Sequence, residues 1–143
     1  MADEEAKKPG RAAHTDPNEA GSPETTPLPE KLKAKPISQK SPAEWAYERL
    51  ILYIKNFEER LAGDQEVAMG FTDTGAGVLK IEGIGYFDPD IVTFYGVDAT
   101  GARTQLVQHV SQLNVLLRAI PKADTAEEPR RIGFRLVEAL EGD

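Results

Sequence analysis

The sequence predicts an α+β domain, in which two helices pack on a small antiparallel sheet of about four strands. Three observations lead to this class. Residues 42–62 carry apolar side chains at helical spacing, residues 66–97 alternate or are rich in β-branched residues, and apolar residues return to helical spacing at 106–120. Helices and strands that occupy separate stretches of one short chain are typical of α+β domains.

The chain changes composition near Ser41. Its 143 residues suffice for one ordinary domain. Residues 1–41 are rich in proline and contain no Phe, Trp or Tyr. Such a stretch lacks the apolar mass that would offset the entropy lost on ordering. We therefore expect a disordered, proline-rich tail at 1–41 and a single α+β domain at 42–143.

Charge and cysteine content exclude several classes of function. The net charge is -7, and because acidic and basic residues balance in the first 42 residues, all of the excess lies in the expected domain. An acidic surface repels phosphate backbones, so a nucleic-acid partner is not expected. Without cysteine there are no disulfides or thiolate metal sites. No run is apolar enough to span a membrane. We expect a cytoplasmic location with no membrane, no metal and no cofactor.

The first helix has a clear start and a broad apolar surface. Ser41 can cap it, Pro42 suits its first position, and Glu44 completes a capping box. We expect it to span 42–62, with Gly63 as the residue after its end. An apolar stripe runs through Tyr47, Leu50, Ile51, Ile54, Phe57 and Leu61.

Trp45, Leu52 and Tyr53 widen the apolar arc of this helix beyond one stripe. Packing at the core and its rim would explain them, and so would a second apolar face buried in a dimer. Gln108 and Gln112 add uncharged polar groups that cost less to desolvate than charges do. A solvated helix face is the alternative for the two glutamines. These five residues are the candidate interaction surface.

The expected strands are 66–72, 78–87 and 91–97. Residues 73–77 form a turn between the first two. Strict alternation places Leu79, Ile81 and Phe87 on one face of the second strand. Asp88-Pro89-Asp90 ends that strand, and Asp98 to Gly101 signals a hairpin or loop.

The stretch from 104 to 120 is ambiguous. Leu106, Val110, Leu113, Leu117 and Ile120 fall within roughly 80° of arc on a helical wheel, which favours a helix over about 106–120. Alternatively, 103–109 is the returning strand of a hairpin and the helix begins near Ser111. Pro121 ends either element. Ile132, Phe134 and Leu136 alternate with Arg131, Gly133, Arg135 and Val137, which predicts a last strand at 131–137.

Candidate ligand-binding groups are Asp88, Asp90, His109, Arg131 and Arg135. Two carboxylates near a turn could hold a cation, although bonds to backbone N–H groups are the commoner use. A histidine is a candidate general base, but a triad would need a nucleophile such as Ser111 and an orienting acid in contact. The arginines could bind an anion or pair with nearby glutamates. No residue is assigned a catalytic role.

The blocks GYFDPDIVTFYG (85–96), TQLVQHVSQLNVLLRAIPK (104–122) and RRIGFRL (130–136) resemble a bacterial family of short proteins of unknown function. This resemblance implies one domain but no activity. The order of helix and strands, with LKIEGIGYFDPDIVTFYG before QLVQHVS, is also similar to the Sm-like RNA chaperone family, Hfq. That family carries a Lys-His pair before its last strand, where this chain has Gln108-His109. It ends after that strand, whereas a further helix and strand are expected here.

We expect a non-enzymatic interaction module that self-associates or docks on a protein partner. No constellation of residues demands catalysis, and the first helix offers more apolar surface than a core of this size needs. Two alternatives stay open. One is a small-molecule or anion-binding domain, with or without catalytic activity, and the other is an Sm-like RNA binder.

Overall fold

A computed structural model describes residues 37–71, 77–122 and 128–142. The two α-helices stand before and after the strands in the chain, as is typical of an α+β domain. The elements in order are η1 (Ile37–Gln39), α3 (Pro42–Glu58), β1 (Gln65–Phe71), β2 (Val78–Phe87), β3 (Ile91–Val97), β4 (Arg103–His109), η2 (Val110–Gln112), β5 (Val115–Pro121) and α4 (Ile132–Gly142).

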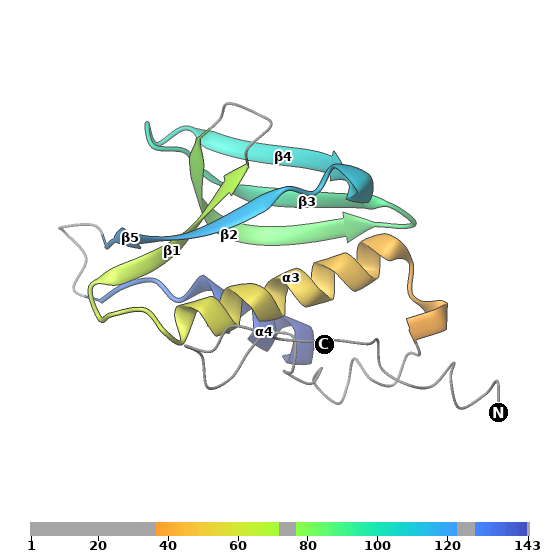
Figure 1. The fold of residues 1–143 in the computed structure, drawn as a ribbon, viewed down its shortest axis with the longest axis horizontal. Coiled ribbons are helices and arrows are strands. Elements are labelled where there is room, and N and C mark those ends of the chain that lie inside the picture. Colours follow the sequence, from red (N-terminus) through yellow and green to blue (C-terminus); the bar gives the residue numbers. More distant parts are fainter. Residues whose placement is uncertain (1–36, 72–76, 123–127, 143) are drawn as a thin grey trace.

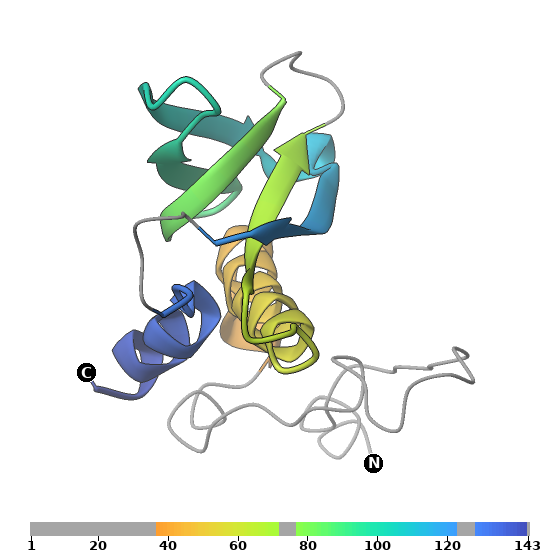
Figure 2. The same ribbon diagram turned by 90° about the vertical axis from the view of Figure 1, so that its left-hand side faces the viewer.

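The five strands form one antiparallel sheet in the order β4-β3-β2-β1-β5. Both α-helices lie on the same side of this sheet, with α3 running along it and α4 beside α3 (Figure 1). The sheet is strongly twisted, and β2 links the β1–β5 pair to the β3–β4 pair (Figure 2). The α+β class is therefore confirmed, with five strands rather than four.

The N-terminus of α3 is formed as predicted. The Ser41 hydroxyl oxygen accepts a hydrogen bond from the Glu44 N–H at 3.0 Å, and Pro42 occupies the first position. The expected end was wrong, because α3 stops at Glu58 and its C-cap is Glu59 in a right-handed conformation. Tighter i→i+3 bonds after Phe57 and Glu58 then satisfy the last carbonyls, so Gly63 is not needed as a cap.

Strands β1, β2 and β3 agree with the predicted ranges to within one residue. The predicted faces of β2 hold only for its first half. A register shift between Ile81 and Gly83 reverses the alternation, so Leu79, Ile81 and Ile84 face the core. Phe87, expected on the same face as Leu79, is instead 74 % exposed.

The prediction of a helix at about 106–120 was wrong. Arg103–His109 is strand β4, as the alternative interpretation held, and it pairs with β3 along its whole length. The helix expected from Ser111 is also absent, because η2 is one short turn and Val115–Pro121 pairs with β1 as β5. Both strands form the edges of the sheet. Most side chains on these edge strands are exposed or half-buried, so the strands do not need a strict alternation of apolar and polar residues. Their sequence therefore fits the spacing of a helix as well as that of a strand.

The strand expected at 131–137 was also wrong, since these residues belong almost entirely to α4. Ile132, Leu136 and Val137 are buried at i, i+4 and i+5, which is helical spacing. The second helix that covers the sheet is therefore α4. A Cβ added to Gly133 would lie 2.8 Å from the Lys55 backbone, so glycine permits the close approach of α4 to α3.

The core lies between the sheet and the two helices. Its largest fully buried side chains are Phe94, Ile51, Ile54, Met69, Leu79, Ile81 and Val92. Residues 37–41, which were expected to be disordered, are ordered, and Lys40 forms a buried ion pair with Glu48 at 2.5 Å. The rest of the expected disordered tail, 1–36, and most of the expected turn, 72–76, lie outside the described residues. Neither α3 nor α4 has the length and apolar character that crossing a bilayer requires.

Candidate functional site

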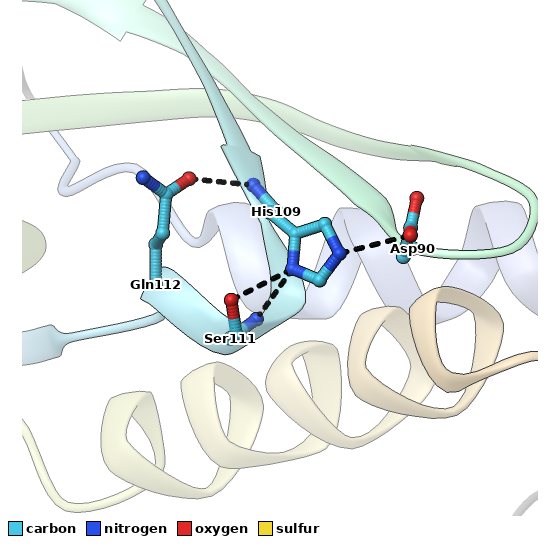
Figure 3. Close-up of polar contacts among 4 residues, drawn as sticks. All are labelled: Asp90, His109, Ser111 and Gln112. Atoms are coloured by element: carbon cyan, nitrogen blue, oxygen red, sulfur yellow. Dashed lines mark hydrogen bonds and ion pairs between the residues drawn. The ribbon is translucent and has the colours of Figure 1, made fainter.

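Three segments of the described chain meet at one edge of the sheet, where β3 begins and β4 ends. His109 is the last residue of β4, and its ring lies between Asp90 and η2 (Figure 3). The His109 Nε2 atom is 2.9 Å from Asp90 Oδ2, and its Nδ1 atom is 2.8 Å from Ser111 Oγ. We call Asp90, His109, Ser111 and Gln112 the His109 corner. The contact that a triad requires, which the sequence could not establish, is present here.

The backbone fixes the proton positions on the imidazole of His109. The Ser111 N–H donates to Nδ1 at 3.1 Å, while the Gln112 Oε1 atom accepts from the His109 N–H at 3.0 Å. Together these bonds form a capping box at the start of η2. Because Nδ1 accepts, the hydrogen-bond network assigns the ring proton of the neutral imidazole to Nε2, from which it donates to Asp90.

The turn that carries Asp90 is anchored on both sides. It contains a cis Asp88–Pro89 peptide bond. The Ser41 hydroxyl donates to Asp88 Oδ1 at 2.5 Å, and the Ala43 N–H donates to the Pro89 carbonyl at 2.9 Å. The Asp90 carbonyl accepts from the Val110 N–H at 2.8 Å. The turn is thus tied both to the first turn of α3 and to η2.

The His109 corner is open to solvent. The side chains of His109 and Asp90 are 46 % and 38 % exposed, and Ser111 is also exposed. The Asp88 carboxylate bonds Ser41, and the Asp90 carboxylate bonds His109. Within the described ranges, no group of three or more His, Cys, Asp or Glu side chains could hold a metal ion. The chemistry available at this corner is proton transfer and nucleophilic attack.

The two candidate arginines do not join the His109 corner. Arg131 donates to the carbonyls of Gln65 and Ala62 at 2.5 and 3.2 Å, beyond the far end of α3. Arg135 lies exposed on α4 rather than on a strand. Since α3 has 17 residues, it separates the two groups by about 25 Å. The anion site suggested by Arg131 and Arg135 is therefore not assembled with Asp88, Asp90 and His109.

A second polar cluster lies at the C-terminal end of α3. The buried Glu58 carboxylate accepts from the Phe134 N–H at 3.2 Å and so caps the first turn of α4. Burial raises the pKa of Glu58 above its ordinary value, while the backbone N–H groups of α4 and the charge of Arg131 partly offset that effect. Sequence reasoning missed this role. The available signal was a glutamate four residues after Ile54, on the apolar stripe.

The candidate interaction residues divide between core and surface. Leu52 and Gln108 are buried, so neither lies on the surface of this fold. Trp45 is half-buried with the Lys40 ammonium 5.4 Å from its ring centroid. Tyr53 and Gln112 are exposed. The five residues therefore do not form one continuous face.

The described sheet has two unpaired edges, β4 and β5. The sequence did not indicate these edges, because a helix was predicted over about 106–120. β4 pairs only with β3 and β5 pairs only with β1 among the described strands. Each edge also presents one strongly exposed aliphatic side chain. Val107 on β4 is 57 % exposed and Leu116 on β5 is 53 % exposed. Unpaired backbone groups beside apolar side chains make a template for pairing with another strand.

The fold and its edges define an α+β domain with two helices on one face of a five-stranded antiparallel sheet. The chain belongs to a family of unknown function (DUF6173), whose model matches residues 35–135. The predicted membership of a family without an assigned function is thereby confirmed. No curated protein and no solved structure matches the chain. The similarity to the Sm-like family stays a prediction.

Proposed function

We propose that this domain is a non-enzymatic interaction module that associates with further copies of itself through its edge strands. The observation that carries the proposal is the pair of seven-residue edges, β4 and β5, that no further strand of the described residues covers. Every copy presents both edges, so a second copy can supply the missing neighbour to each. The proposed compartment is the cytoplasm, because cytoplasmic proteins rarely depend on disulfides and this chain has no cysteine.

The composition of the two edges supports pairing. Monomeric proteins commonly protect an edge strand with lysine, inward-pointing charges, proline or a bulge. In β4 the only permanently charged side chain is Arg103, at the first position, and in β5 it is Arg118. Pro121 stands at the last position of β5. Residues 104–108 of β4 and residues 115–117 at the start of β5 therefore carry no protecting charge, whereas the exposed Arg118 stands at the centre of β5.

The presence of two different edges favours a head-to-tail contact. When β4 of one copy pairs with β5 of the next, each copy still offers a free edge to another. Such a heterologous contact continues until the rotation closes a ring. Pairing of identical edges, β4 with β4 or β5 with β5, would instead give an isologous dimer. The number of subunits therefore distinguishes the two arrangements.

The test is the subunit count of the full chain, measured by light scattering and native mass spectrometry over a dilution series. We expect a defined oligomer of three or more copies. Val107→Lys and Leu116→Lys should each dissociate it, because a lysine at an edge opposes strand pairing. The matched control is Phe134→Lys, since Phe134 is also 57 % exposed but lies on α4, away from both edges.

Two outcomes would overturn the proposal. One is a wild-type chain that stays monomeric at every concentration. The other is an oligomer that Phe134→Lys dissociates as completely as the two edge variants do. A closed dimer that depends on only one edge would retain self-association but replace the head-to-tail arrangement with the isologous one.

The Sm-like RNA binder remains a second candidate because of one observation. The Gln108-His109 pair stands at the end of β4, and η2 and then the last strand, β5, follow it, which is the order on which that similarity rests. Against it stand the missing lysine, the extra helix α4 and the net charge of -7. The purified oligomer tests it directly. Co-purifying RNA that nuclease removes would favour this candidate, and protein free of nucleic acid would favour the simple interaction module.

A further inference from the structure

The His109 corner contains two groups that capping alone does not use. A cap at the start of η2 needs an acceptor for the Ser111 N–H and a partner for the His109 N–H. His109 Nδ1 and Gln112 Oε1 supply both. The Asp90 carboxylate and the Ser111 hydroxyl are additional, and they bond opposite nitrogens of the same ring (Figure 3). The result is a continuous chain from carboxylate to imidazole to hydroxyl.

We propose that Ser111 is an activated nucleophile that accepts an acyl group from an activated ester or thioester. His109 is its general base, and Asp90 is a positioning residue that holds the imidazole. The arrangement meets the geometric requirement for an activated hydroxyl, namely a base within hydrogen-bond reach that is itself oriented by a third group. The observations behind this proposal are the contacts of His109 within one chain, and they do not include the unpaired edges, although His109 is the last residue of β4.

The positions of the protons favour this role. Nε2 carries the ring proton and donates it to Asp90, which leaves the lone pair of Nδ1 directed at Ser111. When Nδ1 takes the hydroxyl proton, the Asp90 carboxylate stabilises the positive charge on the ring. The Ser111 N–H then loses its acceptor, but Gln112 still holds the His109 N–H. One of the two bonds of the capping box therefore survives the transfer.

The proposed step balances without any further reactant. The Ser111 Oγ atom attacks the carbonyl carbon of the acyl donor and forms the new Oγ–C bond. The bond between that carbon and the leaving oxygen or sulfur breaks, and its electron pair departs with the leaving group. The hydroxyl proton passes to His109 Nδ1 and from there to water. The product is an acyl-Ser111, and no hydrolysis of that ester is proposed.

Exposure decides which donors can react. Ser111 and Gln112 are exposed, and His109 and Asp90 are each more than one third exposed. An open surface lets a small donor approach Oγ but does not select among acyl chains. We therefore expect reaction with small activated esters as a class, at one acyl group per chain. A turnover enzyme would additionally need a site that binds the acyl chain and a second, hydrolytic step.

The test exposes the full wild-type chain to p-nitrophenyl acetate and locates the acetyl groups by peptide mass spectrometry. Ser38 is the internal control, because it is an exposed serine in η1 that lies far from His109 along the chain. We expect Ser111 to be acetylated at least about a hundredfold faster than Ser38, the scale of general-base assistance. Equal rates at the two serines in the wild-type chain would overturn the proposal.

Two conservative variants separate the roles. His109→Gln keeps an oxygen that can accept the Ser111 N–H but removes the base, so Ser111 should react no faster than Ser38. Asp90→Asn keeps an acceptor for Nε2–H but removes its charge, and we expect the rate to fall, by up to about the 10⁴-fold loss that this change causes in a Ser-His-Asp triad. Hydrogen exchange of the Ser111 amide should not change in Asp90→Asn. If Asp90 only held the structure in place, a slower reaction would be accompanied by faster exchange of this amide. A rate that His109→Gln leaves unchanged would refute the general base.

Discussion

The two ends of α3 contact polar clusters built from similar groups, yet the clusters differ in what those groups can do. At its N-terminal end, the carboxylate of Asp90 and the ring of His109 are exposed and bond other side chains. At its C-terminal end, Glu58 is buried and Arg131 bonds mainly backbone carbonyls. Exposure leaves the first cluster accessible to reagents, whereas the second is committed to holding α4 in place.

The C-terminal cluster replaces a local cap that α4 lacks. The chain before Ile132 reads Arg130-Arg131, so no Ser, Thr, Asp or Asn can serve as the N-cap. Glu58 supplies the acceptor from α3, and a negative charge there also suits the N-terminus of a helix. Docking of α4 therefore depends on tertiary contacts, in contrast to η2, whose cap comes from its own residues.

The largest effect on stability is expected where α4 approaches α3. A Cβ at Gly133 would lie 2.8 Å from the Cα and N atoms of Lys55, and these backbone atoms cannot rotate away. Overpacking of this kind costs up to about 3 kcal/mol, while alanine gains about 1 kcal/mol in helix propensity. Gly133→Ala should therefore lower the free energy of unfolding by about 2 kcal/mol, as measured by urea denaturation.

Gly63→Ala is the matched control for this prediction. A Cβ at Gly63 meets nothing within 4 Å, and the residue has no positive φ. Its effect should stay within about 0.5 kcal/mol. Equal losses in the two variants would show that the α3–α4 contact is less tightly packed than the distances indicate.

The contrast between the two ends also marks how far the sequence was predictive. The start of α3 and strand β2 carried strong local signals, namely the Ser41 N-cap before Pro42 and an alternating run that ends at Asp88-Pro89-Asp90. The start of α3 and the bounds of β2 were predicted correctly, although the faces of the second half of β2 were not. The candidates Asp90 and His109 were named too, although their contact spans 19 positions and only the pairing of β3 with β4 creates it.

The errors lie where tertiary contacts outweigh local pattern. Leu106 and Leu117 fit a helical wheel, but each is half-buried on an edge strand that the rest of the sheet holds in place. Residues 131–137 alternate like a strand, yet the same apolar residues also fit the spacing of a helix that Glu58 caps from outside. Neither β-sheet pairing across the chain nor a cap supplied by another helix leaves a signal in a short window.

A change of intermediate size is expected from Glu58→Gln, and it should depend on pH. Because burial raises the pKa of Glu58, the protonated carboxyl suits the folded state better than the carboxylate does. The stability it contributes is present below the ordinary pKa of 4.5 and is lost as the pH rises through the folded value. Glutamine removes this loss. Between acidic and neutral pH, the free energy of unfolding of the variant should therefore rise relative to that of the wild type by on the order of 1 kcal/mol.

Urea denaturation at a series of pH values measures that difference. Glu59→Gln is the control, since Glu59 pairs with Lys55 at 3.3 Å on the exposed surface of α3. A surface pair of this kind contributes only about 0.3–0.5 kcal/mol. If Glu58→Gln follows the pH dependence of the wild type throughout, the buried carboxylate is not the group that titrates with unfolding.

The smallest effect on stability is expected at the His109 corner. Asp90→Asn keeps an oxygen that accepts from His109 Nε2 and removes a charge that is already in contact with water. Its unfolding free energy should therefore stay within about 0.5 kcal/mol of the wild type. The same variant is expected to slow acylation of Ser111, so the two measurements should diverge. A loss as large as that of Gly133→Ala would make Asp90 a structural residue and remove the difference between the two ends of α3. A small loss would place the corner among sites whose groups are arranged for reactivity while the fold is stabilised elsewhere.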